Sequence, residues 1–286
     1  MFDPFDWQLA HGRAMELGPR AVVMGVLNVT PDSFSDGGRH DAMSAALVHV
    51  ERMVGEGASI IDIGGESTRP GAAPVTAAQE QDRILPVIEA LADRIDVVLS
   101  VDTYREETAR LAIAAGAHIV NDVWGLQREP GIARVAAETG AGLVIMHTGR
   151  ERQKQSDVIG DQLHFLSRSL EIARDAGVET TRILLDPGFG FAKETMDENL
   201  DLMARFAELH ALGRPLLVGT SRKRFIGTVT GREPAERAAG TAATSVILRM
   251  MGAVIFRVHD VAINVDALRM TDAMVARAVT AETTSR

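Results

Sequence analysis

Polar and charged side chains that could bind a small molecule recur along the chain, each directly after a short apolar run. Acids and amides follow most of the earlier runs and bases follow the last two, at Asn28, Asp62, Asp102, Asn121, Asp186, Arg222, Lys223, Arg257 and His259. A carboxylate that abuts apolar residues is costly to bury unless something binds it. Carboxylates and amides accept hydrogen bonds, whereas the cations suit an anionic group. The pattern predicts a pocket for a small anionic molecule, and the alternative is that the bases neutralise Asp102 and Asp186 across the fold.

Two glycine-rich loops, Asn28–Gly38 and Gly64–Gly71, follow the first two apolar runs. Neither matches GxxxxGK(S/T) or GxGxxG, so neither predicts a nucleotide-binding fingerprint. Both carry many hydroxyl groups and are longer than a strand-to-helix connection requires, which favours lids over a binding site. The alternative is that they are only flexible turns.

The elements that would position these residues alternate between strand and helix. The strand candidates are Val22–Leu27, Ser59–Ile63, Val97–Val101, Ala117–Val120, Gly142–Met146, Arg182–Leu185, Pro215–Val218 and Val254–Val258. Between them lie helix candidates at Ala42–Glu56, Ala77–Asp93, Glu106–Ala115, Pro130–Thr139, Gly160–Ala176, Met196–Leu212, Pro234–Met251 and Val261–Ala278. Such alternation implies a parallel sheet with right-handed crossovers.

Eight such units favour an α/β fold closed into a single-domain (β/α)8 TIM barrel, with an open doubly wound sheet as the structural alternative. We expect residues 1–20 to be peripheral, residues 21–279 to form the barrel and residues 280–286 to be a polar tail. Active sites of such barrels lie at the carboxyl ends of the strands, and the loops after strands seven and eight frequently bind phosphate. The polar positions above fall at those ends.

Composition excludes several classes of function. The 286 residues carry 30 Lys and Arg against 39 Asp and Glu, a net charge of −9, which argues against a binder of nucleic acid or of anionic membranes. There is no cysteine, hence no disulfide and no thiolate metal site. No secretory pattern and no apolar run of about 18 residues is evident, so a cytoplasmic location is expected. Metal-cage motifs such as HExxH are also absent.

Two long segments are similar to the signatures of a known family. They are Val26–Gly38, which reads VLNVTPDSFSDGG, and Ile63–Ala72, which reads IGGESTRPGA, and both resemble dihydropteroate synthases. The likeness continues in Ser100–Thr103, Asn121–Asp122, Leu185–Phe191, Gly219–Lys223 and Arg257–Asp260, and so spans nearly the whole predicted barrel.

The resemblance implies the condensation of 6-hydroxymethyl-7,8-dihydropterin diphosphate with p-aminobenzoate, giving 7,8-dihydropteroate and pyrophosphate in folate biosynthesis. The residues implied in pterin binding are Asp102, Asn121, Asp186 and Lys223. Those implied in diphosphate binding are Asn28, Thr68, Arg69, Arg257 and His259, with Mg²⁺ held by Asn28. Mg²⁺ commonly uses few protein ligands besides phosphates and water, which agrees with the absence of a metal-cage motif.

The family likeness also implies roles in catalysis and in arylamine binding. Lys223, Arg257, His259, Asp36 and Phe34 are the implied catalytic residues, and the two loops would close to exclude water. The p-aminobenzoate site would be lined by Arg69, Pro70, Phe191 and Ser221. The family further implies a homodimer, and the implied partners are small-molecule substrates rather than nucleic acid or a membrane.

Other functions remain open at this stage. A methyltetrahydrofolate-corrinoid methyltransferase shares the barrel and several pterin-binding positions, and a non-catalytic pterin-binding paralogue would keep binding without turnover. A Schiff-base aldolase built on Lys223 is a third alternative. The loop Thr148–Arg152, Trp124 and Arg224 depart from the family pattern or have no assigned role.

Overall fold

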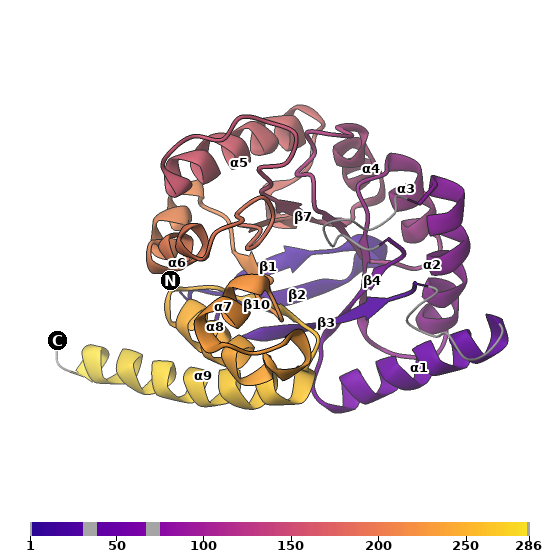
Figure 1. Ribbon diagram of the computed structural model, residues 1–286. Coiled ribbons are helices and arrows are strands. Elements are labelled where there is room, and N and C mark those ends of the chain that lie inside the picture. The colour runs from indigo at the N-terminus through magenta and orange to yellow at the C-terminus, as the bar shows by residue number, and fades with distance from the viewer. Residues whose placement is uncertain (1, 31–38, 67–74, 285–286) are drawn as a thin grey trace.

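The structure, a computed structural model, describes residues 2–30, 39–66 and 75–284, and confirms the predicted barrel (Figure 1). Its eight parallel strands are β3 (Val22–Asn28), β4 (Ile60–Gly64), β5 (Val98–Asp102), β6 (Ile119–Asp122), β7 (Gly142–Met146), β8 (Ile183–Asp186), β9 (Leu217–Val218) and β10 (Ile255–Val258). Strand order is β8-β7-β6-β5-β4-β3-β10-β9, and a parallel bridge between Leu185 and Leu216 joins the two outer strands. That bridge closes the barrel, so the open-sheet alternative is wrong.

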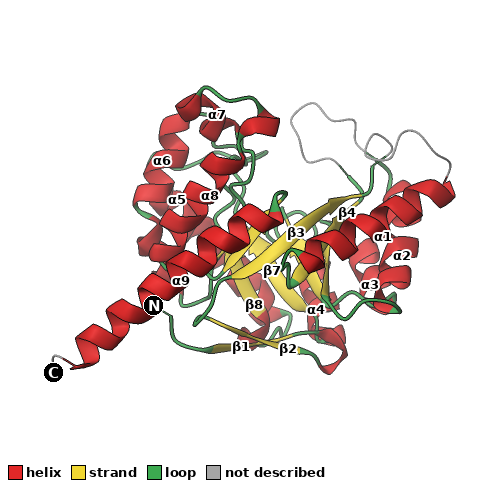
Figure 2. Ribbon diagram, turned by 90° about the horizontal axis from the view of Figure 1, so that it is seen from below, coloured by secondary structure: helices red, strands yellow, loops and turns green. Residues whose placement is uncertain are grey.

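Helices surround the strands on all sides, as Figure 2 also shows. They are α1 (Arg39–Gly55), α2 (Ala77–Ala92), α3 (Glu106–Ala114), α4 (Gly131–Thr139), α5 (Val158–Asp175), α6 (Met196–Ala204), α7 (Arg224–Thr230), α8 (Ala238–Met250) and α9 (Val261–Thr284). Among the described residues, no helix combines the length and the apolar character that crossing a membrane requires.

Two predicted helices are divided in the structure, and a third is longer than predicted. The helix expected over Met196–Leu212 is divided, because α6 ends at Ala204 and the chain continues as a 3₁₀ helix over Phe206–Leu212. The helix expected from Pro234 begins as a separate 3₁₀ turn, Pro234–Glu236, and α8 starts at Ala238. Pro234 is the first residue of the 3₁₀ turn, a position at which the N–H that proline lacks would have no helical partner. The last helix, α9, extends beyond the predicted Ala278 to Thr284.

The inward faces of the strands change character along the barrel axis. On a strand, alternate residues point to the same face. Inward positions near the amino ends are apolar and those near the carboxyl ends are polar, as in the pairs Ile60 and Asp62, Val98 and Asp102, Ile119 and Asn121, Leu184 and Asp186, and Ile255 and Arg257. Residues of the opposite parity, such as Ile61 and Ile63, pack outward in the larger core between strands and helices.

The amino ends of the strands are covered by a hairpin, as Figure 2 shows. Strands β1 (Phe5–Gln8) and β2 (Ala14–Leu17) pair antiparallel, within the segment that the sequence predicts to be peripheral. Trp7 is 0% exposed, and its indole N–H donates to the Arg182 carbonyl at 2.8 Å. A Cβ on Gly142 of β7 would lie 2.5 Å from Leu9 and 3.1 Å from Trp7, so the hairpin packs directly on the backbone there. The hairpin closes this end of the barrel with apolar side chains.

Candidate active site

Four strands bring their polar ends together around one guanidinium. Arg257 of β10 donates from Nε to Asp62 Oδ2 at 2.6 Å and from Nη2 to Asp102 Oδ2 at 2.8 Å. Asp62 also accepts from the Ser100 hydroxyl at 2.6 Å and from the Asn121 amide at 3.1 Å. Pairing of Asp62 with Ser100, and of Asp102 with Asn121, in the strand register places these side chains in adjacent rows. Asp62, which the sequence-based residue roles omit, is thus the most completely hydrogen-bonded carboxylate of the group.

The neutralisation that the sequence leaves open is therefore real for Asp102, and its partner is Arg257. Burial nevertheless raises the pKa of Asp102 to about 7, because desolvation and repulsion from Asp62 outweigh the attraction to Arg257. Burial also raises the pKa of Asp186 to about 6, although the Gly188 N–H donates to Asp186 Oδ1 at 2.7 Å. Two carboxylates poised near neutral pH at the mouth of a barrel are typical of a functional site.

An acceptor without a partner among the described residues lies beside Asp102, on the adjacent strand. Asn121 is 2% exposed and donates its amide to Asp62, but among the described residues its Oδ1 has no hydrogen-bond partner. A buried carbonyl oxygen left in this state costs free energy unless a ligand donates to it. Asn121 is therefore arranged to accept a hydrogen bond from a bound molecule.

Lys223 lies after the short strand β9, at the first position before α7. Burial lowers the pKa of its amine to about 8, and repulsion from Arg257 acts in the same direction. The Nζ atom lies 4.1 Å from the centroid of the Phe191 ring, and the Arg150 guanidinium carbon lies 4.8 Å from the same centroid. Two cations thus contact one aromatic ring, and the contribution of Arg150 could not be foreseen from the loop sequence alone.

His259 and Ser221 form a hydrogen-bonded pair. The backbone N–H of His259 donates to Ser221 Oγ at 3.1 Å, and the same Oγ lies 3.0 Å from the ring atom Nδ1 of His259. The serine hydroxyl can donate to Nδ1 or accept from it, so this contact holds the ring in place in either neutral form. Burial, followed by repulsion from Arg257 and Arg222, lowers the pKa of His259 to about 3, so the ring is neutral at pH 7.

Apolar side chains form a small cluster at the same end of the barrel, and Phe191 is the only one of them to which the sequence analysis gives a role in the site. Val123, Met146 and Phe191 pack together there, and Tyr104 and Trp124 pack against them. Met146 has no role in the sequence analysis, yet it is the last residue of β7 and has the inward parity. That parity was the signal that could have placed it in the site.

Five predicted site residues, Phe34, Asp36, Thr68, Arg69 and Pro70, lie outside the described residues. Asn28 is the last residue of β3, and its side chain has no hydrogen-bond partner within the described part of the chain. Over the same residues, no group of three or more His, Asp or Glu side chains could hold a metal ion by itself. An amide oxygen that completes its ligand set with phosphates and water suits Mg²⁺, so Asn28 fits the predicted ligand role.

Comparisons with known proteins identify the family. The pterin-binding enzyme family matches residues 24–259. The dihydropteroate synthase of Bacillus subtilis (strain 168) is 48% identical over 261 residues, covering 91% of each chain. That of Escherichia coli (strain K12) is 46% identical over 270 residues, covering 92% of this chain and 95% of the relative. The chain belongs to the dihydropteroate synthase family. These matches confirm the resemblance found in the sequence. Dihydropteroate synthases are transferases of folate biosynthesis.

Solved dihydropteroate synthases share the whole barrel. The enzyme of Xanthomonas albilineans with 4-aminobenzoic acid aligns with a TM-score of 0.89 and 44% identity, over 95% of this chain and 99% of that one. The enzyme of Burkholderia cenocepacia complexed with 7,8-dihydropteroate aligns with a TM-score of 0.87 and 40% identity, over 98% of this chain and 100% of the other. These matches favour the synthase over the methyltransferase and aldolase alternatives.

Proposed function

We propose that this dihydropteroate synthase binds its pterin between Lys223 and the acceptors Asp102, Asn121 and Asp186. The observation that carries the assignment is the unpartnered Oδ1 of Asn121, whose neighbour on the adjacent strand is Asp102. Asp186, a further acceptor, ends β8 at the same end of the barrel. The amino group and ring N–H of a pterin need such acceptors, and its carbonyl and ring nitrogen need a donor such as Lys223. Val123, Met146 and Phe191 would supply the apolar surface for the ring. The relative from Burkholderia cenocepacia, solved with 7,8-dihydropteroate, supports this assignment.

The diphosphate would bind on the basic side of the pocket. Arg257 and His259 would supply donors among the described residues, and Thr68 and Arg69 remain predicted contributors. Asn28 would hold Mg²⁺, which when bound supplies positive charge to the departing pyrophosphate. Asp62 and Asp102 hold Arg257 in place, and Ser221 holds His259. Donors fixed in this way need little reorganisation as negative charge develops, which lowers the activation free energy of the reaction.

The arylamine would bind beside Phe191 and Ser221, with Arg69 and Pro70 as further predicted contacts. A relative solved with 4-aminobenzoic acid supports this second substrate. The neutral amine nitrogen attacks the methylene carbon of the pterin, the carbon–oxygen bond to diphosphate breaks with its electron pair on oxygen, and the nitrogen then loses one proton. Because the attacking amine is already neutral, no strong base is needed. The lids that contain Phe34, Asp36, Thr68 and Arg69 would exclude water from the site.

We also propose a cytoplasmic homodimer. Apolar side chains are exposed along α8 and α9, namely Ile247, Met250, Ile263, Met270 and Met274. Helices that present apolar residues to solvent are typical of subunit contacts. Sedimentation at several protein concentrations measures the assembly, and a concentration-independent monomer would contradict it. The absence of cysteine agrees with a reducing compartment.

Pyrophosphate release tests the proposed reaction. The chain is mixed with 6-hydroxymethyl-7,8-dihydropterin diphosphate and Mg²⁺, with and without p-aminobenzoate, while chromatography follows 7,8-dihydropteroate. We expect one pyrophosphate per dihydropteroate, with release that depends on the arylamine. Tight pterin binding without product would indicate the non-catalytic paralogue, and absence of pterin binding would disprove the site.

A further inference from the structure

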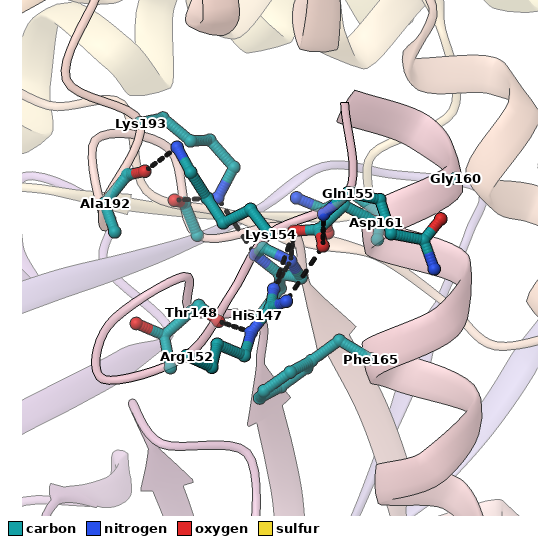
Figure 3. Close-up of polar contacts among 12 residues, drawn as sticks. His147, Thr148, Arg152, Lys154, Gln155, Gly160, Asp161, Phe165, Ala192 and Lys193 are labelled. Atoms are coloured by element: carbon teal, nitrogen blue, oxygen red, sulfur yellow. Dashed lines mark hydrogen bonds and ion pairs between the residues drawn. The ribbon is translucent and has the colours of Figure 1, made fainter. Parts of the chain in front are cut away.

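Two loops at the carboxyl ends of the strands are joined by a buried polar network that the proposed reaction does not use (Figure 3). One loop, 147–157, follows β7, and the other, 187–195, follows β8. His147 is 1% exposed, Asp161 of α5 is 3% exposed and Lys193 is 4% exposed. Ionisable side chains are rarely buried this deeply unless each has a partner.

His147 lies at the centre of the network. Its Nε2 lies 3.0 Å from Asp161 Oδ2, and its Nδ1 lies 3.0 Å from Lys193 Nζ. Arg152 donates to both Asp161 oxygens, at 2.8 and 2.6 Å. Burial, reinforced by the charge of Lys193, lowers the pKa of His147 to about 3. An ammonium group can only donate, so Lys193 donates to Nδ1. Nε2 faces both the Asp161 carboxylate and the Arg152 guanidinium, whose Nη2 lies 2.8 Å away.

Lys193 closes the second loop on itself. Besides His147, its Nζ donates to the Gly188 carbonyl at 2.9 Å and contacts the Phe191 carbonyl at 3.5 Å. The Gly188 carbonyl also accepts from the Phe191 N–H at 3.1 Å. Three acceptors thus surround a buried amine, whose pKa desolvation lowers to about 7 against the attraction of Asp186 and Asp161.

The closed loop bears directly on Asp186. The two backbone groups of Gly188 have different partners: its carbonyl, in the 188–189 peptide, accepts from Lys193, and its N–H, in the 187–188 peptide, donates to Asp186 Oδ1 at 2.7 Å. Gly188 has a φ of 63°, and a Cβ there would lie 2.1 Å from the His147 carbonyl oxygen. The peptide is therefore pressed against the end of β7, and its position depends on the contacts of His147 and Lys193 on either side.

We propose that Lys193 is a positioning residue for pterin binding, which acts through the Gly188 peptide on the Asp186 carboxylate and, through the same turn, on Phe191. The inference rests on the proposed function, because it takes Asp186 and Phe191 as pterin contacts. Lys193 fixes which way the Asp186 oxygens point before the substrate arrives. A carboxylate held in place by a neighbouring peptide loses less entropy when it accepts a ligand N–H.

The variant Lys193→Met tests this role, since methionine fills a similar volume without the amine. Equilibrium titrations with 6-hydroxymethyl-7,8-dihydropterin report the pterin pocket, and titrations with inorganic pyrophosphate report the basic side. We expect the pterin dissociation constant to rise about tenfold, the effect of losing one charged hydrogen bond. Pyrophosphate affinity is expected to change less than about twofold, because Arg257 and His259 lie in and directly after β10, away from the loop that follows β8. Equal losses for the two ligands, or an unchanged pterin affinity, would overturn the inference.

Lys154→Met is the matched control. Lys154 belongs to the first loop and donates to the Ala192 carbonyl at 2.7 Å and to Glu198 at 2.5 Å, but it contacts neither Gly188 nor His147. We expect pterin affinity within about twofold of the unchanged chain, as for an exposed ion pair. A loss equal to that of Lys193→Met would assign the effect to general loosening of the loop and overturn the inference.

A rescue experiment covers the case in which Lys193→Met folds poorly. The chain has no cysteine, so Lys193→Cys introduces the only thiol. Unfolding, alkylation with 2-bromoethylamine and refolding convert that residue into a lysine analogue, in which sulfur replaces one methylene. We expect the alkylated protein to regain pterin affinity that the unalkylated protein lacks. Equal affinity in the two forms would overturn the role of the amine.

The variant Asp186→Asn tests the pterin site separately from the role of Lys193. If Asp186→Asn leaves pterin affinity unchanged, the proposed pterin site itself is wrong. If Asp186→Asn weakens pterin binding while Lys193→Met does not, the site stands and only the role of Lys193 is wrong.

Discussion

The two ends of the barrel are built from the same strands and differ completely in chemistry. At the amino ends, Trp7 and Leu17 of the hairpin pack on inward residues such as Met24 and Ile60, all of them fully buried and apolar. At the carboxyl ends, the next inward positions hold carboxylates, amides and Arg257. The first end resembles a protein core, and the second holds two buried carboxyl groups, Asp102 and Asp186, whose pKa values lie close to neutral pH.

The comparison shows how the fold separates stability from function. Apolar burial supplies stability at the hairpin end, where packing on Gly142 leaves no room for another atom. The polar end buries charge, which contributes little net stability even when it is paired. We therefore expect changes at the polar end to alter activity and changes at the hairpin end to alter the free energy of unfolding.

The largest effect is expected for Arg257→Met. This change removes the donor that pairs Asp62 with Asp102, together with a proposed diphosphate contact. We expect kcat/KM to fall about a thousandfold, because two buried carboxylates lose their partner and the leaving group loses a donor. Steady-state rates measure it. Arg222→Met, which removes the more exposed ion pair with Asp260, is the control and should cost less than about tenfold.

Trp7→Ala tests the other end. Removing a completely buried indole leaves a cavity beneath the strands, and we expect a loss of about 3 kcal/mol in the free energy of unfolding. Urea denaturation measures the loss. The kcat of the folded fraction should stay within about twofold, because the packed barrel separates this residue from the polar end. A large fall in kcat without a loss of stability would show that the hairpin end contributes to activity, contrary to expectation.

Lys223→Met sharpens the account of the polar end. The amine contacts the Phe191 ring and is a proposed donor to the pterin. We expect the pterin dissociation constant to rise about tenfold, as for one lost charged hydrogen bond, with little change in unfolding. Calorimetric titration measures the affinity. Arg224→Met, one residue further along and exposed, should leave it unchanged; equal losses would show that the assignment to Lys223 is wrong.

The smallest effect is expected in the pH profile of kcat/KM. Asp186 and Asp102, with pKa values of about 6 and about 7, accept hydrogen bonds at both oxygens only when ionised, so activity should fall as the pH drops below 7. Lys223, with a pKa of about 8, loses its charge above that value, so activity should also fall there. An optimum between pH 7 and 8 follows. Lys223→Met should remove the alkaline limb, whereas Trp7→Ala should leave both limbs in place.

Much of the fold and of the site could be predicted because the signals are local. Apolar runs and helical stretches alternate in a fixed order, and a polar residue lies at or near most of the strand ends. The barrel and the positions of Asp62, Asp102, Asn121 and Asp186 therefore follow from the sequence. Where local signals compete, the prediction is less accurate. The expected helix over Met196–Leu212 has suitable residues throughout, yet the structure changes to 3₁₀ hydrogen bonding after Ala204.

The sequence by itself determined the strand ends at which the reactive groups lie, because side-chain parity and strand length are local properties. Only the tertiary structure decided the partners. Arg257 reaches Asp62 across 195 residues and Asp102 across 155, and Lys193 reaches His147 across 46. Trp7 likewise gives no local indication of which end of the barrel it covers. Such pairs depend on barrel closure and on strand register, which bring distant residues together without any local pattern in the chain.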